Sequence, residues 1–353
     1  MKVLQIVTQL ERAGAQTLSY WLEQMLSDEF DVITLFLYNK SGSDLFPDDR
    51  ALAGARPSKV SSWASVFQQL VSKLRTSKSD VALAHTHFAI AACVLAAPFA
   101  RFPKIVAVHH WPIEKYPLIC RWIIKLGDAS RIIRQHVYVS DSIAPSNSDL
   151  VITNPVPGRF TAEDIGQNAQ ADLLIVARHS VEKSIDTAIC ALAKLPGRHL
   201  SLVGTGNLSD DLRQVANRLG VEDRIAFLGP LPNPKVRELI AGCNVLVLPS
   251  KWEAMPIVLL EGLSGDATMV VSDIAAHAFL IDCGAALAFH TGSPDSLARA
   301  ISEAEGERNR TSAALARLEL QSSMSESATI EKWRRTLAGL SHKVTVKLGD
   351  TPQ

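Results

Sequence analysis

Short apolar runs alternate with segments in which apolar residues recur at helical spacing, over most of the chain. In the first half, the apolar runs predict strands at 2–7, 31–37, 80–84, 104–108, 136–139 and 150–153. Helical spacing predicts helices between them at 15–27, 63–76 and 88–97. Regular alternation of strand and helix is typical of βαβ units, so the sequence predicts an α/β fold with parallel sheets.

The second half restarts the same alternation. Its apolar runs predict strands at 172–177, 199–203, 224–228, 244–248, 268–272 and 286–289. Helices are expected at 184–195, 209–219, 234–242, 257–264 and 294–304, and a last one at 327–340. The turn-rich segment 154–158 and the polar stretch 161–170 separate the halves. We therefore expect two doubly wound domains, 1–157 and 158–326, with ligands bound at the carboxyl ends of their strands.

Composition narrows the class of protein. The 353 residues are 47% hydrophobic and 20% charged, which suits a globular protein of two domains. Lys and Arg together number 36, as do Asp and Glu, so no net field favours nucleic acid. The five cysteines are far apart, which predicts a reducing compartment and neither disulfides nor a zinc site. The longest apolar run, 88–100, is too short to span a bilayer, and residues 2–7 suit a strand better than a signal peptide, so we expect a cytoplasmic protein.

The segment 250–261, SKWEAMPIVLLE, follows the strand 244–248 and should form a loop and then a helix. Pro256 suits the first helical position, so the amides around 255–258 would be free to bind an anion. Glu253 precedes this turn. Glu261 lies among apolar residues, so its carboxylate needs a partner such as a ribose diol. Alternatively, Glu253 only stabilises the helix start and Glu261 is half exposed.

Two cations occupy the loop after the strand 172–177. Arg178 ends the strand and Lys183 precedes the next helix, so both could neutralise one diphosphate. A basic pair in such a loop is also common on ordinary solvated surface. Gly204 and Gly206 follow the strand 199–203 without the third glycine of a dinucleotide motif. Gly14, after the first strand, either presents amides to a phosphate or forms a tight turn.

Together these blocks resemble the two-Rossmann (GT-B) nucleotide-sugar glycosyltransferases, and specifically glycosyltransferase family 4. The resemblance covers the C-terminal half through IVARHSVEKSIDTAICAL, LSLVGTGNLSDDLRQVANRLGVEDRIAFLGPLP and NVLVLPSKWEAMPIVLLEGLSGDATMVVSDI. Glu253 and Glu261 match the E-x7-E motif of the family, and Arg178 with Lys183 matches its Arg and Lys five residues apart. The N-terminal half is similar more loosely, through KVLQIVTQL, AGAQ, DVALAHTH, KIVAVHH, YVS and VITNPV.

The resemblance implies roles for these residues. Arg178 and Lys183 would hold the donor diphosphate, Glu253 would contact the transferred sugar and Glu261 the ribose. His109 would contact the sugar or the acceptor, with His110 as the alternative assignment. The remaining residues implied in donor binding are Gly14, Gly204, Gly206, Met255, Pro256 and Ile257. The family retains anomeric configuration and needs neither a metal nor a cofactor, and its last helix (327–345 here) packs back on the N-terminal domain.

Several positions depart from the pattern of the family. Asp266 stands where it has glycine and Thr268 where it has proline, and Ala275-Ala276 replaces its Gly-Gly. These changes fall in the loop beside the donor sugar, so the sequence does not identify that sugar.

Residues 101–134 carry seven basic residues against two acidic ones, interleaved with Trp111, Trp122 and several isoleucines. This pattern is typical of a surface that rests on an anionic membrane, where a lipid-linked acceptor would be met. Alternatively, Trp122 and the isoleucines are core residues. His85 and His87 lack a third metal ligand in the sequence, so we expect them to line a cleft or to have structural partners.

The leading hypothesis from the sequence is a cytoplasmic, retaining glycosyltransferase that uses a nucleotide-diphosphate sugar and a glycan or lipid-linked saccharide acceptor, as in bacterial surface polysaccharide synthesis. Three alternatives remain. A sugar-nucleotide epimerase of the same fold is disfavoured by the two charged pairs. A degenerate, non-catalytic homologue is suggested by Asp266, Thr268 and Ala275-Ala276, which depart from the family pattern. A plain dehydrogenase lacks the glycine fingerprint.

Overall fold

The computed structural model of the chain describes residues 1–11, 14–40, 45–100, 104–145, 150–158, 171–304 and 306–340, with no side-chain description for 307–312. Its internal contacts divide the chain into two compact units. Unit 1 comprises Met1–Thr153 and Thr329–Gln353, and unit 2 comprises Asn154–Ala328. The predicted polar stretch 161–170 and the last part of the predicted segment 327–345 lie outside the described residues.

Unit 1 is built on a six-stranded parallel sheet with the order β2-β1-β3-β4-β5-β6. Its strands are β1 (Lys2–Leu10), β2 (Asp31–Asn39), β3 (Val81–His85), β4 (Lys104–His109), β5 (Ile133–Tyr138) and β6 (Leu150–Val151). All six were predicted, but β5 begins three residues earlier than expected because its first half carries the polar residues Arg134 and Gln135 and lacks an apolar run.

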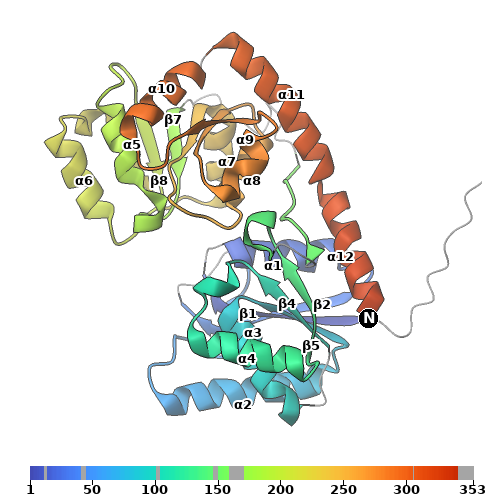
Figure 1. Cartoon of the computed structure of the whole chain (residues 1–353). Helices are drawn as coiled ribbons and strands as arrows, with labels where there is room; N and C mark the ends of the chain where they lie inside the picture. The colour runs from blue at the N-terminus through green and yellow to red at the C-terminus, as the bar shows by residue number, and fades with distance from the viewer. Residues whose placement is uncertain are drawn as a thin grey trace, which may run out of the picture. The chain divides into compact units, whose positions relative to one another are not determined.

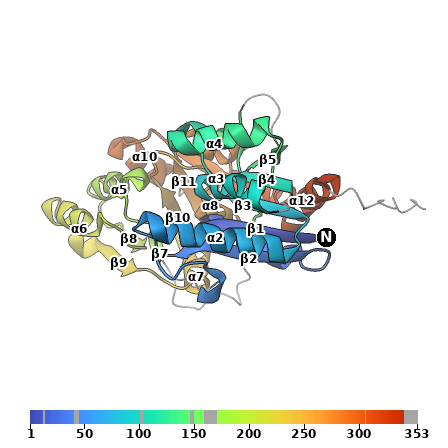
Figure 2. The ribbon, with the colours of Figure 1, turned by 90° about the horizontal axis from the view of Figure 1, so that it is seen from below.

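Helices cover both faces of this sheet. They are α1 (Gly14–Met25), α2 (Val60–Ser77), α3 (His87–Ala96), α4 (Leu118–Ala129) and, from the end of the chain, α12 (Glu326–Leu340). Figure 1 shows α2, α3 and α4 together on one side of the strands and α1 on the other, and in Figure 2 α2 and α3 lie over β1 to β3. The apolar cluster beneath them joins Leu4, Leu70, Ile90 and Ile124 from four elements.

The last helix, α12, is part of unit 1 from Thr329 onward. Trp333 and Leu337 are fully buried. Arg334 donates to the Glu29 carboxylate from Nε at 2.7 Å, and Lys104 donates to the carbonyl of Leu340. Because these contacts join α12 to the turn after α1 and to the start of β4, this part of α12 packs on unit 1.

Unit 2 repeats the architecture with the order β12-β11-β10-β7-β8-β9, again all parallel. The strands are β7 (Ala171–Val176), β8 (Leu200–Val203), β9 (Ile225–Gly229), β10 (Cys243–Leu248), β11 (Thr268–Ser272) and β12 (Ala286–Phe289), each within one residue of its prediction. The helices are α5 (Ile185–Leu192), α6 (Ser209–Arg218), α7 (Asn233–Gly242), α8 (Ile257–Leu263), α9 (Ala278–Ile281), α10 (Pro294–Ala304) and α11 (Glu307–Ser323).

Each sheet has one point at which the chain changes direction across it. In unit 1 this switch point lies between β1 and β3, because β2 lies on the other side of β1. In unit 2 it lies between β7 and β10, because β8 and β9 lie on the other side of β7. Loops that leave the two strands at a switch point turn to opposite faces, so a crevice for ligands opens at their carboxyl ends.

Candidate active site

An ion pair joins the two loops at the switch point of unit 2. Lys183, from the loop after β7, donates to the Oε1 atom of Glu253, from the loop after β10. Ser250 Oγ donates to the same oxygen at 2.7 Å. The side chains of Lys183 and Glu253 are only 17% and 11% exposed, so solvent screens the pair little. The backbone N–H of Lys251 also donates to the Glu182 carbonyl at 2.8 Å, which ties the loops together.

The local backbone explains how Lys183 reaches this position. Residues Val181–Lys183 form one 3-10 turn, and Ser184 follows with φ of +47°. This left-handed residue separates the turn from α5. Ser184 is buried, and its hydroxyl lies 2.9 Å from Thr187 Oγ1, an interaction that helps hold the left-handed residue in place.

Arg178 lies in the same loop but does not join the ion pair. Its side chain is 61% exposed, and Nη2 lies 3.5 Å from Glu182 Oε1. The structure therefore brings Lys183 to Glu253 and leaves Arg178 at the surface beside Glu182. A role for Arg178 in diphosphate binding stays a prediction.

Glu261 is buried on α8, with 4% of its surface exposed, so the alternative that it is half exposed is wrong. Its Oε1 atom lies 3.7 Å from Nε of Arg237, on α7. Burial raises the pKa of Glu261 to about 7, and the nearby Arg237 guanidinium only partly offsets this effect. Sequence reasoning predicted that the carboxylate has a partner but did not find Arg237, because the two lie on separate helices, 24 positions apart in the sequence.

The segment before α8 differs in one detail from its prediction. Pro256 precedes the helix with an extended ψ of 117°, and Ile257 is the first helical residue. Pro256 was expected to be the first helical residue, but it is the residue just before the helix. Met255 and Pro256 are buried, whereas Ile257 is half-buried. Binding of an anion by the amides of this segment stays a prediction.

Gly204 and Gly206 allow two neighbouring loops to pack closely. Gly204 has φ of +123°, and a Cβ atom there would lie 2.0 Å from the carbonyl oxygen of Ala177. A Cβ atom on Gly206 would lie 2.3 Å from the carbonyl oxygen of His179. The His179 N–H donates to the Thr205 carbonyl at 3.0 Å in the same contact. These glycines are therefore required to position the loop that carries Arg178, whether or not they also contact a ligand.

The backbone of unit 2 accommodates the residues that replace glycine and proline of the family pattern. Thr268 is buried and opens β11 beside Val245. Ala275 and Ala276 belong to a 3-10 turn and, among the described residues, neither has the positive φ that favours glycine. Asp266 is exposed. Among the described residues of unit 2, no positive φ calls for glycine at Asp266, Ala275 or Ala276, and Thr268 takes part in β11 without proline.

In unit 1, the two consecutive histidines at the end of β4 have different surroundings. His109 is fully buried; its Nδ1 lies 3.0 Å from the Tyr116 hydroxyl and its Nε2 lies 2.8 Å from Nδ1 of His136. Both nitrogens of His109 are thus bound to the protein, which disagrees with the prediction that it contacts a sugar. His110 retains 8% exposure and has one nitrogen bound, Nε2, at 3.2 Å from His85. The alternative assignment, His110, is therefore the better candidate.

The switch point of unit 1 also carries local strain. Thr86 follows β3 with φ of +72° and ψ of 160°, a region that is populated almost only by glycine. Its hydroxyl hydrogen bonds to Thr8 Oγ1, from β1, at 2.5 Å. Because Thr86 turns the chain, His87 opens α3 and does not share a strand face with His85.

Gly14, half-buried, is the first residue of α1, and its contact with a phosphate stays a prediction. Among the described residues, no three His, Cys, Asp or Glu side chains are grouped as metal ligands would be.

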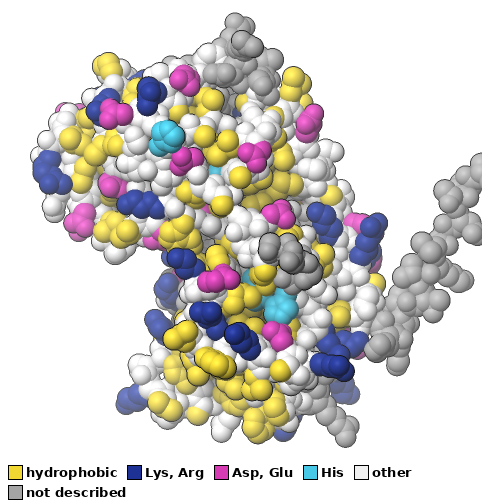
Figure 3. Space-filling model, viewed as in Figure 1, with side chains coloured by type: hydrophobic (Ala, Val, Ile, Leu, Met, Phe, Trp, Pro, Cys, Tyr) yellow, Lys and Arg dark blue, Asp and Glu magenta, His cyan; other side chains and the backbone are white. Residues whose placement is uncertain are grey.

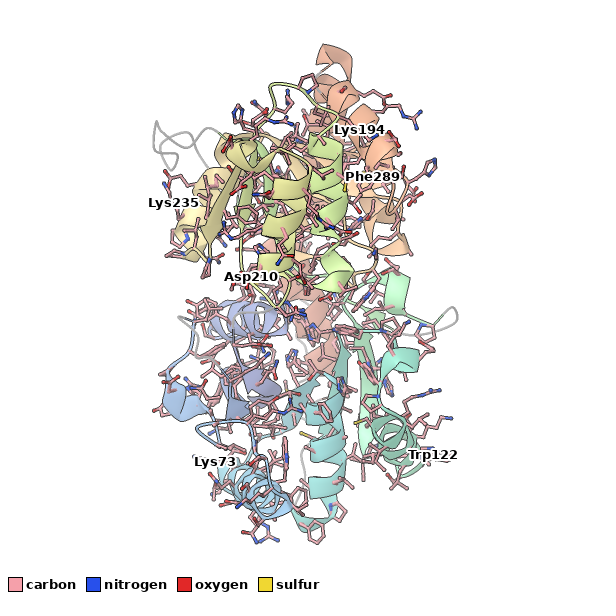
Figure 4. All side chains as sticks on the ribbon, turned by 90° about the vertical axis from the view of Figure 1, so that its left-hand side faces the viewer. Lys73, Trp122, Lys194, Asp210, Lys235 and Phe289 are labelled. Carbon is pink, nitrogen blue, oxygen red and sulfur yellow. The ribbon has the colours of Figure 1, made fainter. Side chains whose placement is uncertain are left out.

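Four apolar side chains of α4 face outward, whereas Ile124 is buried in the core of unit 1. The alternative that Trp122 and the isoleucines are core residues is therefore wrong for Trp122 and Ile119 and correct for Ile124. Leu118, Ile119, Trp122 and Leu126 are 60 to 69% exposed. Lys125 Nζ lies 5.7 Å from the centre of the Trp122 ring. Figure 3 shows hydrophobic and basic side chains side by side over this helix, and Figure 4 shows Trp122 on its outer side.

No helix in the described part of the chain is both long and apolar enough to cross a bilayer. Arg101, the first basic residue of the predicted segment, lies outside the described residues.

Comparison with known families supports the interpretation of unit 2. Residues 162–328 match the family described as Glycosyl transferases group 1, so the chain carries a domain of this kind. An uncharacterized glycosyltransferase of Methanocaldococcus jannaschii is 32% identical over 111 residues, 31% of this chain and 28% of that protein. The lipopolysaccharide core biosynthesis glycosyltransferase LpsE of Rhizobium meliloti is 33% identical over 152 residues, 41% of this chain and 44% of LpsE. The chain thus spans less than half the length of either relative.

Comparison with solved structures addresses the fold. The crystal structure of Anabaena HepE in complex with UDP-glucose matches 96% of this chain and 100% of its own, with a TM-score of 0.80 at 18% identity. The predicted GT-B class of two parallel-sheet α/β domains is therefore confirmed.

Proposed function

We propose that the protein is a retaining glycosyltransferase of family 4 that transfers a sugar from a UDP- or GDP-linked donor to a glycan or lipid-linked saccharide. The observation that carries this proposal is the pairing of Lys183 with Glu253 at the switch point of unit 2. An ammonium group and a carboxylate held there suit a reaction in which an anion leaves a sugar that becomes positively charged.

Lys183 would stabilise the leaving diphosphate. The ammonium group has three donors, and the bond to Glu253 uses one of them. The other donors can bind phosphate oxygens, and Arg178, exposed in the same loop, can move to the same group. Negative charge on the diphosphate grows as the glycosidic bond breaks, so these contacts strengthen in the transition state. The two cations would together replace the divalent metal that many transferases use.

Glu253 would serve in two ways. Its Oε1 atom holds Lys183 and accepts from Ser250, which leaves Oε2 for a hydroxyl group of the transferred sugar. Glu261 would accept hydrogen bonds from the two ribose hydroxyls. A buried carboxylate whose pKa is raised to about 7 is a costly feature, and binding a diol offsets part of that cost.

The related proteins support the substrate class. HepE was crystallised with UDP-glucose, which makes a UDP-hexose the first donor to test. LpsE is named for lipopolysaccharide core biosynthesis, which favours an acceptor from bacterial surface polysaccharide synthesis.

The surface of α4 supports a location at the inner face of the cell membrane. Its exposed apolar side chains, Leu118, Ile119, Trp122 and Leu126, lie beside the cations of Arg121 and Lys125. Apolar groups enter the headgroup region, and each nearby cation contributes about 1 kcal/mol on an anionic membrane. A lipid-linked acceptor would be presented at the same surface.

Calorimetric titration with UDP, GDP and ADP and with their sugars, followed by product analysis in excess EDTA, tests the proposal. We expect binding of one nucleotide and transfer to an acceptor with the anomeric configuration of the donor. Epimerisation of a UDP-sugar without transfer would identify an epimerase. Nucleotide binding without turnover across a panel of acceptors would identify a non-catalytic homologue.

A further inference from the structure

A chain of hydrogen bonds leads from the middle of β1 to the end of β4. It joins Gln5, His85 and His110, which project from the same face of three adjacent strands. The register pairs Val7 with His85 and His85 with Val108, so alternate residues, and hence Gln5 and His110, share that face. His109 projects from the opposite face, which explains its separate partners, Tyr116 and His136.

The direction of the first bond is fixed by chemistry. Gln5 Nε2 lies 2.8 Å from the Ser19 carbonyl and 2.9 Å from Thr34 Oγ1. A carbonyl oxygen can only accept, so the amide nitrogen of Gln5 must face it. Gln5 Oε1 therefore faces His85, with Nε2 of the ring at 3.1 Å.

The same logic extends to the two histidines. Because Gln5 Oε1 can only accept, His85 carries its proton on Nε2. Burial lowers the pKa of His85 well below 6.5, so the ring is neutral and Nδ1 has a lone pair. That atom lies 3.2 Å from Nε2 of His110, which must then be the donor. Burial also lowers the pKa of His110 to about 4, so this ring is neutral and its Nδ1 is left as an acceptor.

No described residue supplies a partner for Nδ1 of His110. His110 as a whole residue is 8% exposed, in contrast to His85 and His109, which are completely buried. It stands at the carboxyl end of β4, next to β3 and the strained Thr86 at the switch point. A neutral imidazole nitrogen with a fixed lone pair accepts a hydrogen bond from a hydroxyl group, the commonest donor of a sugar.

We propose that Gln5 and His85 are positioning residues that hold His110 as the tautomer protonated on Nε2, so that its Nδ1 accepts a hydrogen bond from a sugar hydroxyl. The identity of the ligand rests on the proposed glycosyltransferase function. The tautomer does not, because it follows from the hydrogen-bond chain alone. Residues that act in this way contribute to the reaction without touching the substrate.

Nitrogen NMR of histidine-labelled protein at pH 7 tests the tautomer directly. The signals of His110 are assigned by their loss in His110→Gln. We expect a protonated Nε2 and an unprotonated Nδ1 in the unmodified protein. Protonation on Nδ1, or an equal mixture of tautomers, would overturn the proposal, and this result needs neither substrate nor activity.

Two substitutions of His85 test the positioning role. His85→Leu removes the acceptor for His110, whereas His85→Asn retains a carbonyl oxygen close to the place of Nδ1. We expect His85→Leu to mix the tautomers of His110 and to raise the KM for the acceptor about tenfold, with donor affinity unchanged. His85→Asn should restore both. A tautomer and an acceptor KM that stay unchanged in His85→Leu would refute the positioning role, and absence of turnover in every protein would count against the proposed function alone.

Discussion

Lys183 and Glu253 lie 70 positions apart in the sequence, and the structure joins their charged groups at the point where the sheet of unit 2 changes direction. Both side chains are largely buried, and Ser250 holds the carboxylate from the other side. A pair so placed is poorly screened by solvent. The ion pair thus places two charged groups at the position where an open α/β sheet binds its ligands.

Replacing Glu261 should stabilise the protein while it weakens donor binding. The pKa of Glu261 is raised from 4.5 to about 7 in the folded protein, so the folded state binds more protons than the unfolded state between these values. The free energy of unfolding therefore falls as the pH rises from 4.5 to 7 and Glu261 ionises, by about 3 kcal/mol at most. Glu261→Gln should raise the Tm at pH 8 and leave it nearly unchanged at pH 4.5. A lower Tm at pH 8 would show that the pair with Arg237 outweighs burial.

Donor affinity should depend on pH through the same group. Ribose hydroxyls donate to a carboxylate, so binding requires the ionised form of Glu261 and is linked to loss of a proton. Between pH 6 and pH 8 the affinity for a nucleotide-sugar should rise about tenfold. Calorimetry with the Glu261→Gln protein is the matched control, since its affinity should be weaker and independent of pH. An equal rise with pH in both proteins would assign the dependence to another group.

Gly204→Ala should destabilise unit 2 severely. The φ of +123° is unfavourable for alanine, and the new Cβ would meet the Ala177 backbone. A cost of about 3 kcal/mol or more is expected in urea unfolding. Gly220→Ala is the control, because Gly220 has φ of +66° and no other atom within 4 Å of the place of an added Cβ. The cost there should be about 1 kcal/mol. Equal losses in the two proteins would refute the close contact between the loops.

Membrane binding should depend on α4. Replacing Leu118, Ile119 and Trp122 together by serine should reduce cosedimentation with vesicles rich in anionic lipid at least tenfold, because apolar insertion is lost. Binding by the unmodified protein should also weaken with added salt. Val60→Ser is the control, since Val60 is 88% exposed on another helix of unit 1. Undiminished binding by the triple variant would remove α4 from the membrane contact.

The fold could be predicted from the sequence because buried parallel strands are continuous apolar runs. Each of the twelve strands in the described part of the chain carries at least a short run of this kind. Helix α11 was not predicted, because its residues are mostly polar and show no apolar stripe. Helix α9 has only four residues, too few to show a helical period. Helix α4 was recognised as an amphipathic surface but not as a helix, because prolines at 112 and 117 and aromatic residues obscure where it begins.

The candidate site was predictable where a motif is local. Lys183, Glu253 and Glu261 were found from their loops and spacing, whereas the partners Arg237 and Gln5 emerge only when distant elements are brought together. The choice between His109 and His110 also needed the structure. Adjacent residues of a strand point to opposite faces, and the sequence did not show which face holds Tyr116 and which holds His85.

The proposed function depends on the ammonium group of Lys183, which would stabilise a departing diphosphate without a metal ion. The most direct measurement is kcat for sugar transfer by Lys183→Ala in excess EDTA, beside Lys194→Ala, which removes an exposed lysine of the same unit. Loss of a charged contact made mainly in the transition state should lower kcat about a thousandfold. Lys194→Ala should match the unmodified protein. Full activity in Lys183→Ala, or activity in the unmodified protein that EDTA abolishes, would show that Lys183 does not take the place of a metal ion.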